Sequence, residues 1–224
     1  MNSKFKLVNI LIAVVMIAGP LGITFSKAAA NNTAQPIPFS QDWSNTGLIT
    51  TNDDWSGIPG VIGYRGDNLT SATGADPQTI LQPDDPGVVN VNANQSNPNT
   101  FTTGGVTEFE LADPVVALAG SGTADAPYLL IALDTTGKTN IQVSYTLRDL
   151  ESGTDNAVQQ VALHYRVGNS GNFTNIPEAY VADATIGNDV KTTNASITLP
   201  TACENVSLVQ LRIMTTNAVG NDEW

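Results

Sequence analysis

The sequence predicts an all-β protein, an antiparallel β-sandwich of the jelly-roll kind preceded by a signal peptide. Apolar residues recur at every second position in several short segments, as in half-buried strands. Gly, Pro and Asn gather between these segments, where they favour turns. No stretch keeps helical periodicity over three turns. Roughly ten short strands separated by such turns indicate two packed sheets.

Residues 1–30 have the three parts of a signal peptide. Two lysines precede an almost wholly apolar run over 7–23, and three alanines at 28–30 supply the small residues that signal peptidase needs. We expect cleavage after Ala30. The alternative is an uncleaved anchor, because the run is close to the roughly 20 residues that span a bilayer. Asn9 and the Gly19-Pro20 break within the run favour cleavage, after which no membrane segment is expected.

The charge of the chain argues against direct nucleic acid binding. The formal net charge is −12, and loss of residues 1–30 makes it more negative by three, because three lysines and no acid leave. Nucleic acid is bound through phosphates that Lys and Arg neutralise, and the few basic residues here are scattered. An acidic surface is typical of a secreted, extracellular or cell-surface protein, and it leaves carboxylates for calcium.

The first third of the mature chain is rich in turns. Residues 31–38 form a polar leader, expected to be disordered or to lie along a sheet edge, and the sandwich module is expected over 39–224. Residues 39–66 carry large aromatic side chains among glycines and prolines, which indicates short strands around aromatic anchors. Residues 67–103 are loop-like, with one short strand expected near 88–91.

The strand pattern is clearer beyond Gly104. Strands are expected over 106–111, 115–118, 128–133, 195–199 and 209–213, with weaker edge strands over 173–176 and 180–184. Alternation is strongest over 141–147 and again over 161–167. A polar break at 151–156 separates these two segments, so we expect them to form an antiparallel hairpin facing one core.

The sequence shows no catalytic constellation. Residues 132–139 read A-L-D-T-T-G-K-T, but a phosphate loop needs glycine where Ala132 stands, and a helix where a strand is expected here. His164, the sole histidine, lies on the strand face opposite Leu163 and Tyr165, where we expect it to be exposed. No G-x-S-x-G turn is present, and one histidine cannot build a multi-histidine metal site.

Acidic turns are the candidate metal ligands. Calcium takes six to eight oxygen ligands, which carboxylates and carbonyls of sandwich loops can supply. The residues we assign to a calcium site are Asp42, Asp222 and Glu223. None of the acidic pairs has the spacing of a calcium-loop motif, so solvated turns are the competing interpretation.

Aromatic residues near the start of the module are the candidate ligand site. Trp55 and Tyr64 could stack against sugar rings, as aromatic side chains do in carbohydrate-binding sandwiches. The competing interpretation is that these side chains belong to the core.

Several phrases of the sequence together resemble the N-terminal sandwich module of large secreted bacterial proteins. These phrases are residues 51–57, 59–60, 63–67, 97–105, 120–127, 155–162 and 212–224. Many such proteins carry an endonuclease/exonuclease/phosphatase or other phosphoesterase domain further on, with lamin-tail or immunoglobulin-like domains. The resemblance implies that a strand follows the acidic turn before Trp224, so we expect the module to lack its last strand and to precede downstream domains.

The leading hypothesis is a non-catalytic N-terminal module of a secreted multidomain hydrolase, of the extracellular nuclease or phosphoesterase type. Its role would be adhesion or substrate presentation, with downstream domains and extracellular polysaccharide as partners. Alternatives are an independent carbohydrate-binding module and a cell-surface structural protein.

Overall fold

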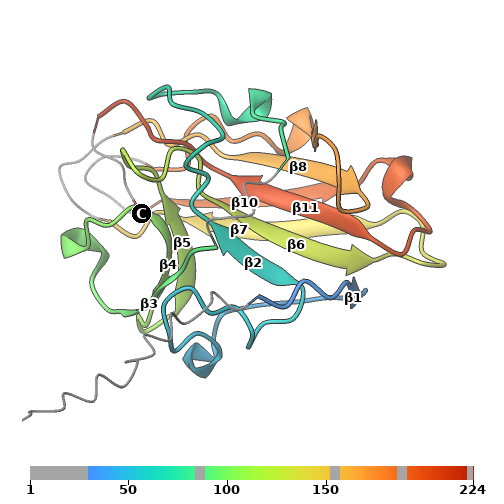
Figure 1. Cartoon of the computed structure of the whole chain (residues 1–224), viewed down its shortest axis with the longest axis horizontal. Helices are drawn as coiled ribbons and strands as arrows, with labels where there is room; N and C mark the ends of the chain where they lie inside the picture. Colours follow the sequence, from blue (N-terminus) through green and yellow to red (C-terminus); the bar gives the residue numbers. More distant parts are fainter. Residues whose placement is uncertain (1–29, 84–88, 152–156, 186–190, 221–223) are drawn as a thin grey trace, which may run out of the picture.

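The chain is all-β, as the sequence predicts. The computed structural model describes residues 30–83, 89–151, 157–185, 191–220 and 224. These residues form eleven strands and five short 3-10 helices, without an α-helix (Figure 1). The strands are β1 (Gln35–Pro36), β2 (Val61–Tyr64), β3 (Asn92–Gln95), β4 (Gly105–Phe109), β5 (Val115–Ala119), β6 (Tyr128–Asp134), β7 (Gln142–Arg148), β8 (Ala162–Val167), β9 (Thr174–Asn175), β10 (Thr192–Thr198) and β11 (Val209–Met214). The 3-10 helices are η1 (Thr46–Leu48), η2 (Pro77–Thr79), η3 (Pro98–Thr100), η4 (Pro177–Ala179) and η5 (Thr201–Cys203).

The largest sheet has six strands in the order β1-β6-β11-β8-β9. β2 is the sixth strand and shares one edge of β6 with β1, because β2 pairs with residues 128–131 and β1 with residues 133–134. β6 and β8 both pair antiparallel with β11 along its whole length. β11 is therefore the central strand of the sheet, with β6 on one side and β8 on the other.

Two smaller sheets cover one face of the six-stranded sheet. β7 pairs antiparallel with β10, and β4 lies between β3 and β5. Odd-numbered residues of β6 and β11 point to this inner face, where Leu133 and Leu211 pack with Val143 and Tyr145 of β7. Further along β6, Leu129 packs with residues of β4 and β5. Both small sheets therefore share a core with the same larger sheet.

The outer face of the six-stranded sheet is covered by the segment 69–82. Leu69 and Ile80 pack there on Tyr128, Leu130 and Met214, the even-numbered residues of β6 and β11. This face is both apolar and polar, because β8 places the buried Arg166 on it and β11 places the buried Gln210 and Arg212 there.

The predicted strands are largely confirmed, and the predicted hairpin is wrong. Strands occur close to the expected positions over 128–134, 142–148, 162–167, 192–198 and 209–214. However, β7 pairs with β10 while β8 pairs with β11 and β9, so the two strands lie in different sheets. Alternation fixes which side of a strand is buried but not which strand lies beside it. The turn residues 152–156 lie outside the described part of the chain.

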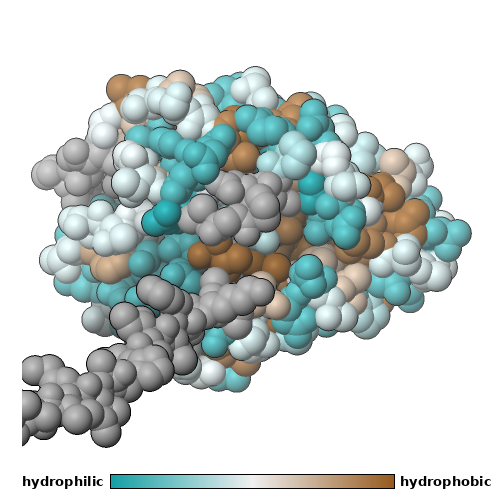
Figure 2. Space-filling view, viewed as in Figure 1, coloured by the Kyte–Doolittle hydropathy of each residue, from teal (hydrophilic) through white to brown (hydrophobic). Residues whose placement is uncertain are grey.

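The surface is mostly polar. The face in Figure 2 is largely hydrophilic, with hydrophobic residues in a band across its middle. Among the described residues, the large hydrophobic side chains that are well exposed are Val158, Val167 and Val219. The described part of the chain contains no helix of the length and apolar character needed to cross a bilayer.

Candidate functional site

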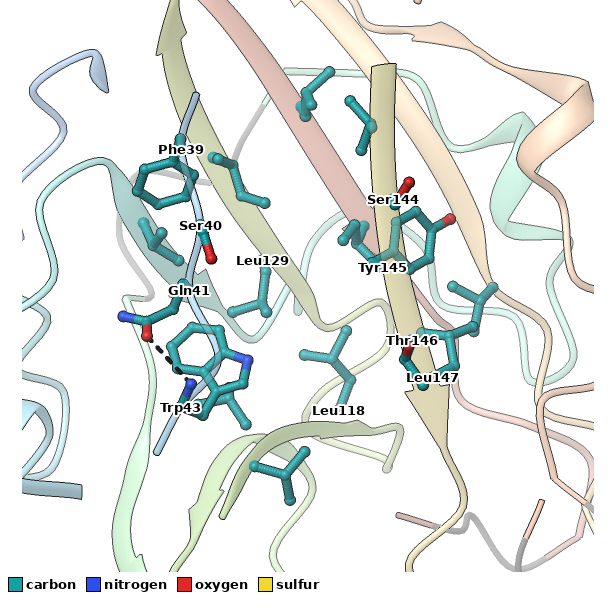
Figure 3. A pocket seen from close by; sticks show the side chains of 18 of the residues that line it. Phe39, Ser40, Gln41, Trp43, Leu118, Leu129, Ser144, Tyr145, Thr146 and Leu147 are labelled. Atoms are coloured by element: carbon teal, nitrogen blue, oxygen red, sulfur yellow. Dashed lines mark hydrogen bonds between the residues drawn. The ribbon is translucent and has the colours of Figure 1, made fainter. Parts of the chain in front are cut away.

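The candidate site is a groove of about 660 Å³ between the two smaller sheets. Its floor is the inner face of the six-stranded sheet, where Leu129, Ile131 and Leu211 line it. β7 borders one side, the segment 37–43 borders the opposite side, and Leu118 of β5 lies between them at one end (Figure 3). β5 and β7 do not pair with each other. The volume lies in the range of ligand-binding clefts, roughly 300–1,000 Å³.

The two walls of the groove carry different side chains. Figure 3 shows residues Phe39, Ser40, Gln41 and Trp43 of the segment after β1 on one side, and β7 on the other. The Gln41 side-chain carbonyl accepts a hydrogen bond from the Trp43 backbone N–H, at 3.2 Å. Hydrogen bonds within the segment hold this wall in place, because the pairing of β1 with the six-stranded sheet ends at Pro36.

β7 contributes a buried hydroxyl to the opposite wall. Val143, Tyr145 and Leu147 are half-buried and lie in the groove lining, while Ser144 and Thr146 between them are exposed. The Tyr145 hydroxyl oxygen is buried without a hydrogen-bond partner. Burial raises the pKa of Tyr145 to about 12, so the hydroxyl keeps its proton at neutral pH.

Within the described residues, one edge of β7 has no pairing strand. Ile141 and Asp149 bond to the strand across from them, since Leu199 N–H donates to Ile141 C=O and Asp149 N–H donates to Lys191 C=O, each at 2.8 Å. In an antiparallel ladder such residues alternate with ones whose N–H and C=O point the other way. The main-chain N–H and C=O groups of the odd-numbered residues of β7 therefore point to β10. Those of Gln142, Ser144, Thr146 and Arg148 point to the opposite edge, at the groove.

Trp224 lies at the same edge. Leu150, the next residue in the even series, donates its backbone N–H to the Trp224 C=O at 2.7 Å. The Trp224 ring packs on Phe109 of β4, with ring centroids 5.2 Å apart, and its Nε1 donates to the Phe101 C=O at 2.9 Å. Trp224 therefore connects the free edge of β7 to the sheet that holds β5.

The groove offers few charged groups. Its charged lining residues are Lys138, Arg148 and Asp149. Arg148 already forms an ion pair with Asp113 at 2.5 Å and donates to the Asp113 C=O. Most other lining residues are apolar or carry hydroxyls and amides, a composition typical of ligand-binding clefts.

His164 does not face the groove. It lies on the outer face of the six-stranded sheet, as its position opposite Leu163 predicts, but it is fully buried and not exposed. The segment around Pro77 covers it there. Burial and the nearby charge of Arg212 lower the pKa of His164 from 6.5 to about 3, so the imidazole is neutral. The expectation of an exposed histidine is corrected, because the sequence does not reveal the covering segment.

Arg212 fixes that covering segment and was missed by sequence reasoning. It is fully buried, and its Nε donates to His164 Nδ1 at 3.1 Å. Its two terminal nitrogens donate to the C=O groups of Gln82 (3.1 Å) and Ile80. The guanidinium lies 4.0 Å from the Phe173 ring centroid, a cation–π distance. A single arginine within a strand predicted to be buried was the available signal.

Asp42, one of the residues assigned to calcium, lies in an exposed turn. Asp42 accepts bonds from the Ser44 N–H and hydroxyl, at 3.0 and 2.8 Å, and these bonds lower its pKa. Within the described ranges no three His, Cys, Asp or Glu side chains are grouped as metal ligands. Asp222 and Glu223 lie outside those ranges. Asp42 is thus an exposed turn residue, and its role in calcium binding remains a proposal.

The structure places Trp55 in the core. Its ring is fully buried, and its Nε1 donates to the Asn90 C=O at 3.0 Å. Gly63 makes room for the ring, since a Cβ there would be 2.5 Å from Trp55 Cζ2. Sugar stacking needs an open ring face, which Trp55 does not have. Tyr64 is half-buried and stacks on Tyr128, with centroids 4.9 Å apart.

Comparison of the chain with family models, with curated proteins and with solved structures gave no match.

Proposed function

We propose that the chain is a non-catalytic β-sandwich module of jelly-roll type, exported by its signal peptide to the cell exterior or cell surface. We further propose that it belongs to a secreted multidomain hydrolase of the extracellular nuclease or phosphoesterase type. Its role there is adhesion or substrate presentation next to the domain that performs hydrolysis. The all-β sheets, the shared core and the acidic composition support this function.

The contact between His164 and Arg212 is the observation that carries the non-catalytic part of the proposal. A general base must reach a substrate proton and titrate near neutral pH. His164 is buried on the outer face, its Nδ1 accepts the Arg212 Nε–H, and its pKa is lowered to about 3. The sole imidazole of the chain is therefore a structural acceptor.

Hydrolysis assays with the purified protein test this proposal. Double-stranded DNA, RNA and p-nitrophenyl phosphate are incubated with the protein, with and without calcium and magnesium. We expect product formation equal to that of a mock preparation. Hydrolysis that exceeds the mock and falls in Asp149→Asn, a groove variant, would show that the chain is an enzyme and overturn the proposal.

Binding assays test the adhesion role. We expect retention on extracellular polysaccharide but no shift of duplex DNA at physiological salt, because the net charge is strongly negative. A glycan array without signal, with and without calcium, would remove the polysaccharide partner. Since Trp55 is buried, an independent carbohydrate-binding module that stacks sugars on Trp55 and Tyr64 is the weaker alternative.

A further inference from the structure

β10 is the outer strand of the two-stranded sheet. All seven of its residues pair with β7 in one regular antiparallel register, from Thr192 opposite Arg148 to Thr198 opposite Gln142. Within the described part of the chain, no strand pairs with the other edge of β10. One long edge of this sheet is therefore unpaired where the structure describes the chain.

The main-chain groups on this edge follow from the ladder to β7. Leu199 N–H donates to the Ile141 C=O, and the Lys191 C=O accepts from the Asp149 N–H, so the odd-numbered residues on the β10 side bond to β7. In an antiparallel ladder the residues between them point their N–H and C=O groups the other way. The residues whose main-chain groups point outward are Thr192, Asn194, Ser196 and Thr198.

The other strand edges outside the groove are short or already bonded. β1 and β9 contain two residues each. On β3, the Ala93 N–H donates to Asn52 Oδ1 at 2.9 Å. On β2, the Gly63 C=O accepts from the Asn90 N–H at 2.9 Å. Outside the groove, β10 is therefore the long and regular edge strand that the described residues leave unpaired.

β10 also lacks the features that keep edge strands apart. Natural edge strands are protected by charged side chains, proline or bulges. Residues 192–198 contain no charged residue and no proline, and their register with β7 does not shift. Lys191, which precedes the strand, donates its Nζ to the Asp183 C=O at 2.6 Å. In a chain with a formal net charge of −12, this neutral edge lets two copies approach without opposed carboxylates on the paired strands.

We propose that β10 pairs antiparallel with β10 of a second copy of the chain, about a two-fold axis at Ala195. In this register Asn194 lies opposite Ser196 of the partner subunit, and Thr192 lies opposite Thr198 of the partner subunit. Each opposed pair exchanges two main-chain hydrogen bonds, so the outward-pointing groups of both copies are satisfied. The two small sheets join into one sheet of four strands, in the order β7-β10-β10-β7.

The side chains of β10 suit pairing with a second β10. Its even-numbered residues are exposed and carry hydroxyls or an amide. Groups of this kind already bond between β7 and β10, since the Ser144 hydroxyl donates to Ser196 Oγ at 3.1 Å and the Thr146 hydroxyl donates to Asn194 Oδ1 at 2.8 Å. Similar polar pairs form between two copies. Each copy has one β10, so the contact closes as a two-fold dimer and leaves no β10 edge for a third copy.

Sedimentation velocity tests the association. One strand pair buries less than the roughly 1,200 Å² of stable complexes, so the dimer dissociates on dilution. We expect monomer at about 1 µM and mostly dimer at about 1 mM, concentrations that bracket weak binding. Monomer throughout this range would overturn the proposal. The measurement needs neither polysaccharide nor a phosphoester, so this pairing, which goes beyond the proposed function, can fail separately from it.

A charge on the edge tests whether β10 makes the contact. Ser196→Lys places an ammonium group opposite Asn194 of the partner subunit, in the way that protected edge strands carry lysine. Ser207→Lys is the matched control, because Ser207 is exposed outside β7 and β10 and the variant has the same net charge. We expect Ser196→Lys to raise the dimer dissociation constant by about tenfold or more and Ser207→Lys to change it by less than about twofold. Circular dichroism checks that both variants keep their strands, and equal changes would overturn the edge contact.

Disulfide trapping tests the register. Ala195→Cys places two thiols at the axis, where opposed Cα atoms of such a pair lie about 4.5 Å apart, within disulfide range. Thr193→Cys is the matched control, because its two thiols would be offset by four residues, roughly 14 Å along the strands. Native Cys203 is buried in both variants. After mild oxidation we expect a covalent dimer on a non-reducing gel for Ala195→Cys and little for Thr193→Cys. Equal cross-linking, or none in Ala195→Cys at concentrations where it sediments as a dimer, would overturn the proposal.

Discussion

The two faces of the six-stranded sheet are covered in different ways. The outer face carries buried polar side chains, yet the segment 69–82 closes it, because Arg212 donates to two C=O groups of that segment. The inner face is more apolar, yet a groove of about 660 Å³ remains open over it. Closure of a face thus depends on whether a covering segment has bonding partners, and not on how apolar the face is.

The comparison is tested most strongly at Arg212. Arg212→Ala leaves the buried C=O groups of Ile80 and Gln82 without donors, so we expect the free energy of unfolding to fall by about 3–5 kcal/mol. Urea unfolding followed by tryptophan fluorescence measures this loss. The matched control is Arg148→Ala, which breaks the ion pair with the largely exposed Asp113 and is expected to cost less than about 1 kcal/mol. Equal losses would contradict the comparison.

Two neighbouring residues of β6 allow the closed outer face and the open inner face to be compared within one strand. Leu130 is buried on the outer face, whereas Ile131 is half-buried and lines the groove. We expect Leu130→Ala to lower the free energy of unfolding by about 3 kcal/mol and Ile131→Ala by about 1 kcal/mol. Thermal denaturation of both variants under one set of conditions checks the difference. A larger loss at Ile131 would mean that the groove is closed in solution.

The outer face should also respond to acid through His164. Its pKa is about 3 in the folded protein, while the unfolded chain has the ordinary value of 6.5. Below pH 6.5 the unfolded state therefore binds a proton that the folded state does not. Stability is complete above pH 6.5 and falls as the pH is lowered toward 3, by about 1 kcal/mol between pH 6.5 and 5.5.

Equilibrium unfolding at several pH values measures this slope. Arg212 is the charged group in contact with His164, and it stays protonated over this range. His164→Gln is the control, since it removes the titrating group, and its stability should be flatter between pH 6.5 and 5.5. The same slope in both proteins would assign the effect to carboxylates instead.

The smallest effect is expected in the groove wall. Tyr145→Phe removes a buried hydroxyl that has no partner, so stability should stay constant or rise by up to about 1 kcal/mol. Tyr180→Phe is the counterpart, because the Tyr180 hydroxyl donates to Gln160 Oε1 at 2.6 Å and its loss should cost about 1 kcal/mol. Chemical denaturation measures both changes in the free energy of unfolding and distinguishes a gain in Tyr145→Phe from a loss in Tyr180→Phe. A clear loss in Tyr145→Phe would indicate that its hydroxyl has a partner in solution.

The strands could be predicted because their side-chain alternation is local information. β6, β10 and β11 lie close to their expected positions, and the face of His164 was predicted as well. The pairing of β7 with β10 could not be predicted. The two strands lie more than forty residues apart in the sequence, and nothing in the alternation of β7 distinguishes β8 from β10 as its neighbour.

The site was predicted less well, because it depends on packing between distant segments. Trp55 was expected as a ligand or a core residue, and its burial follows from Gly63 and the Asn90 C=O, which lie elsewhere in the chain. Arg212 was seen only as one of a few scattered basic residues. Its role arises from the segment that lies over it, which has no strand pattern of its own.

The short strand β1 has a consequence for solubility. β1 and β2 together occupy the edge of β6, and Pro36 stands within β1, where it lacks an N–H for further pairing. This side of the large sheet is thus blunted against association with other molecules. β7 has no such protection along the groove.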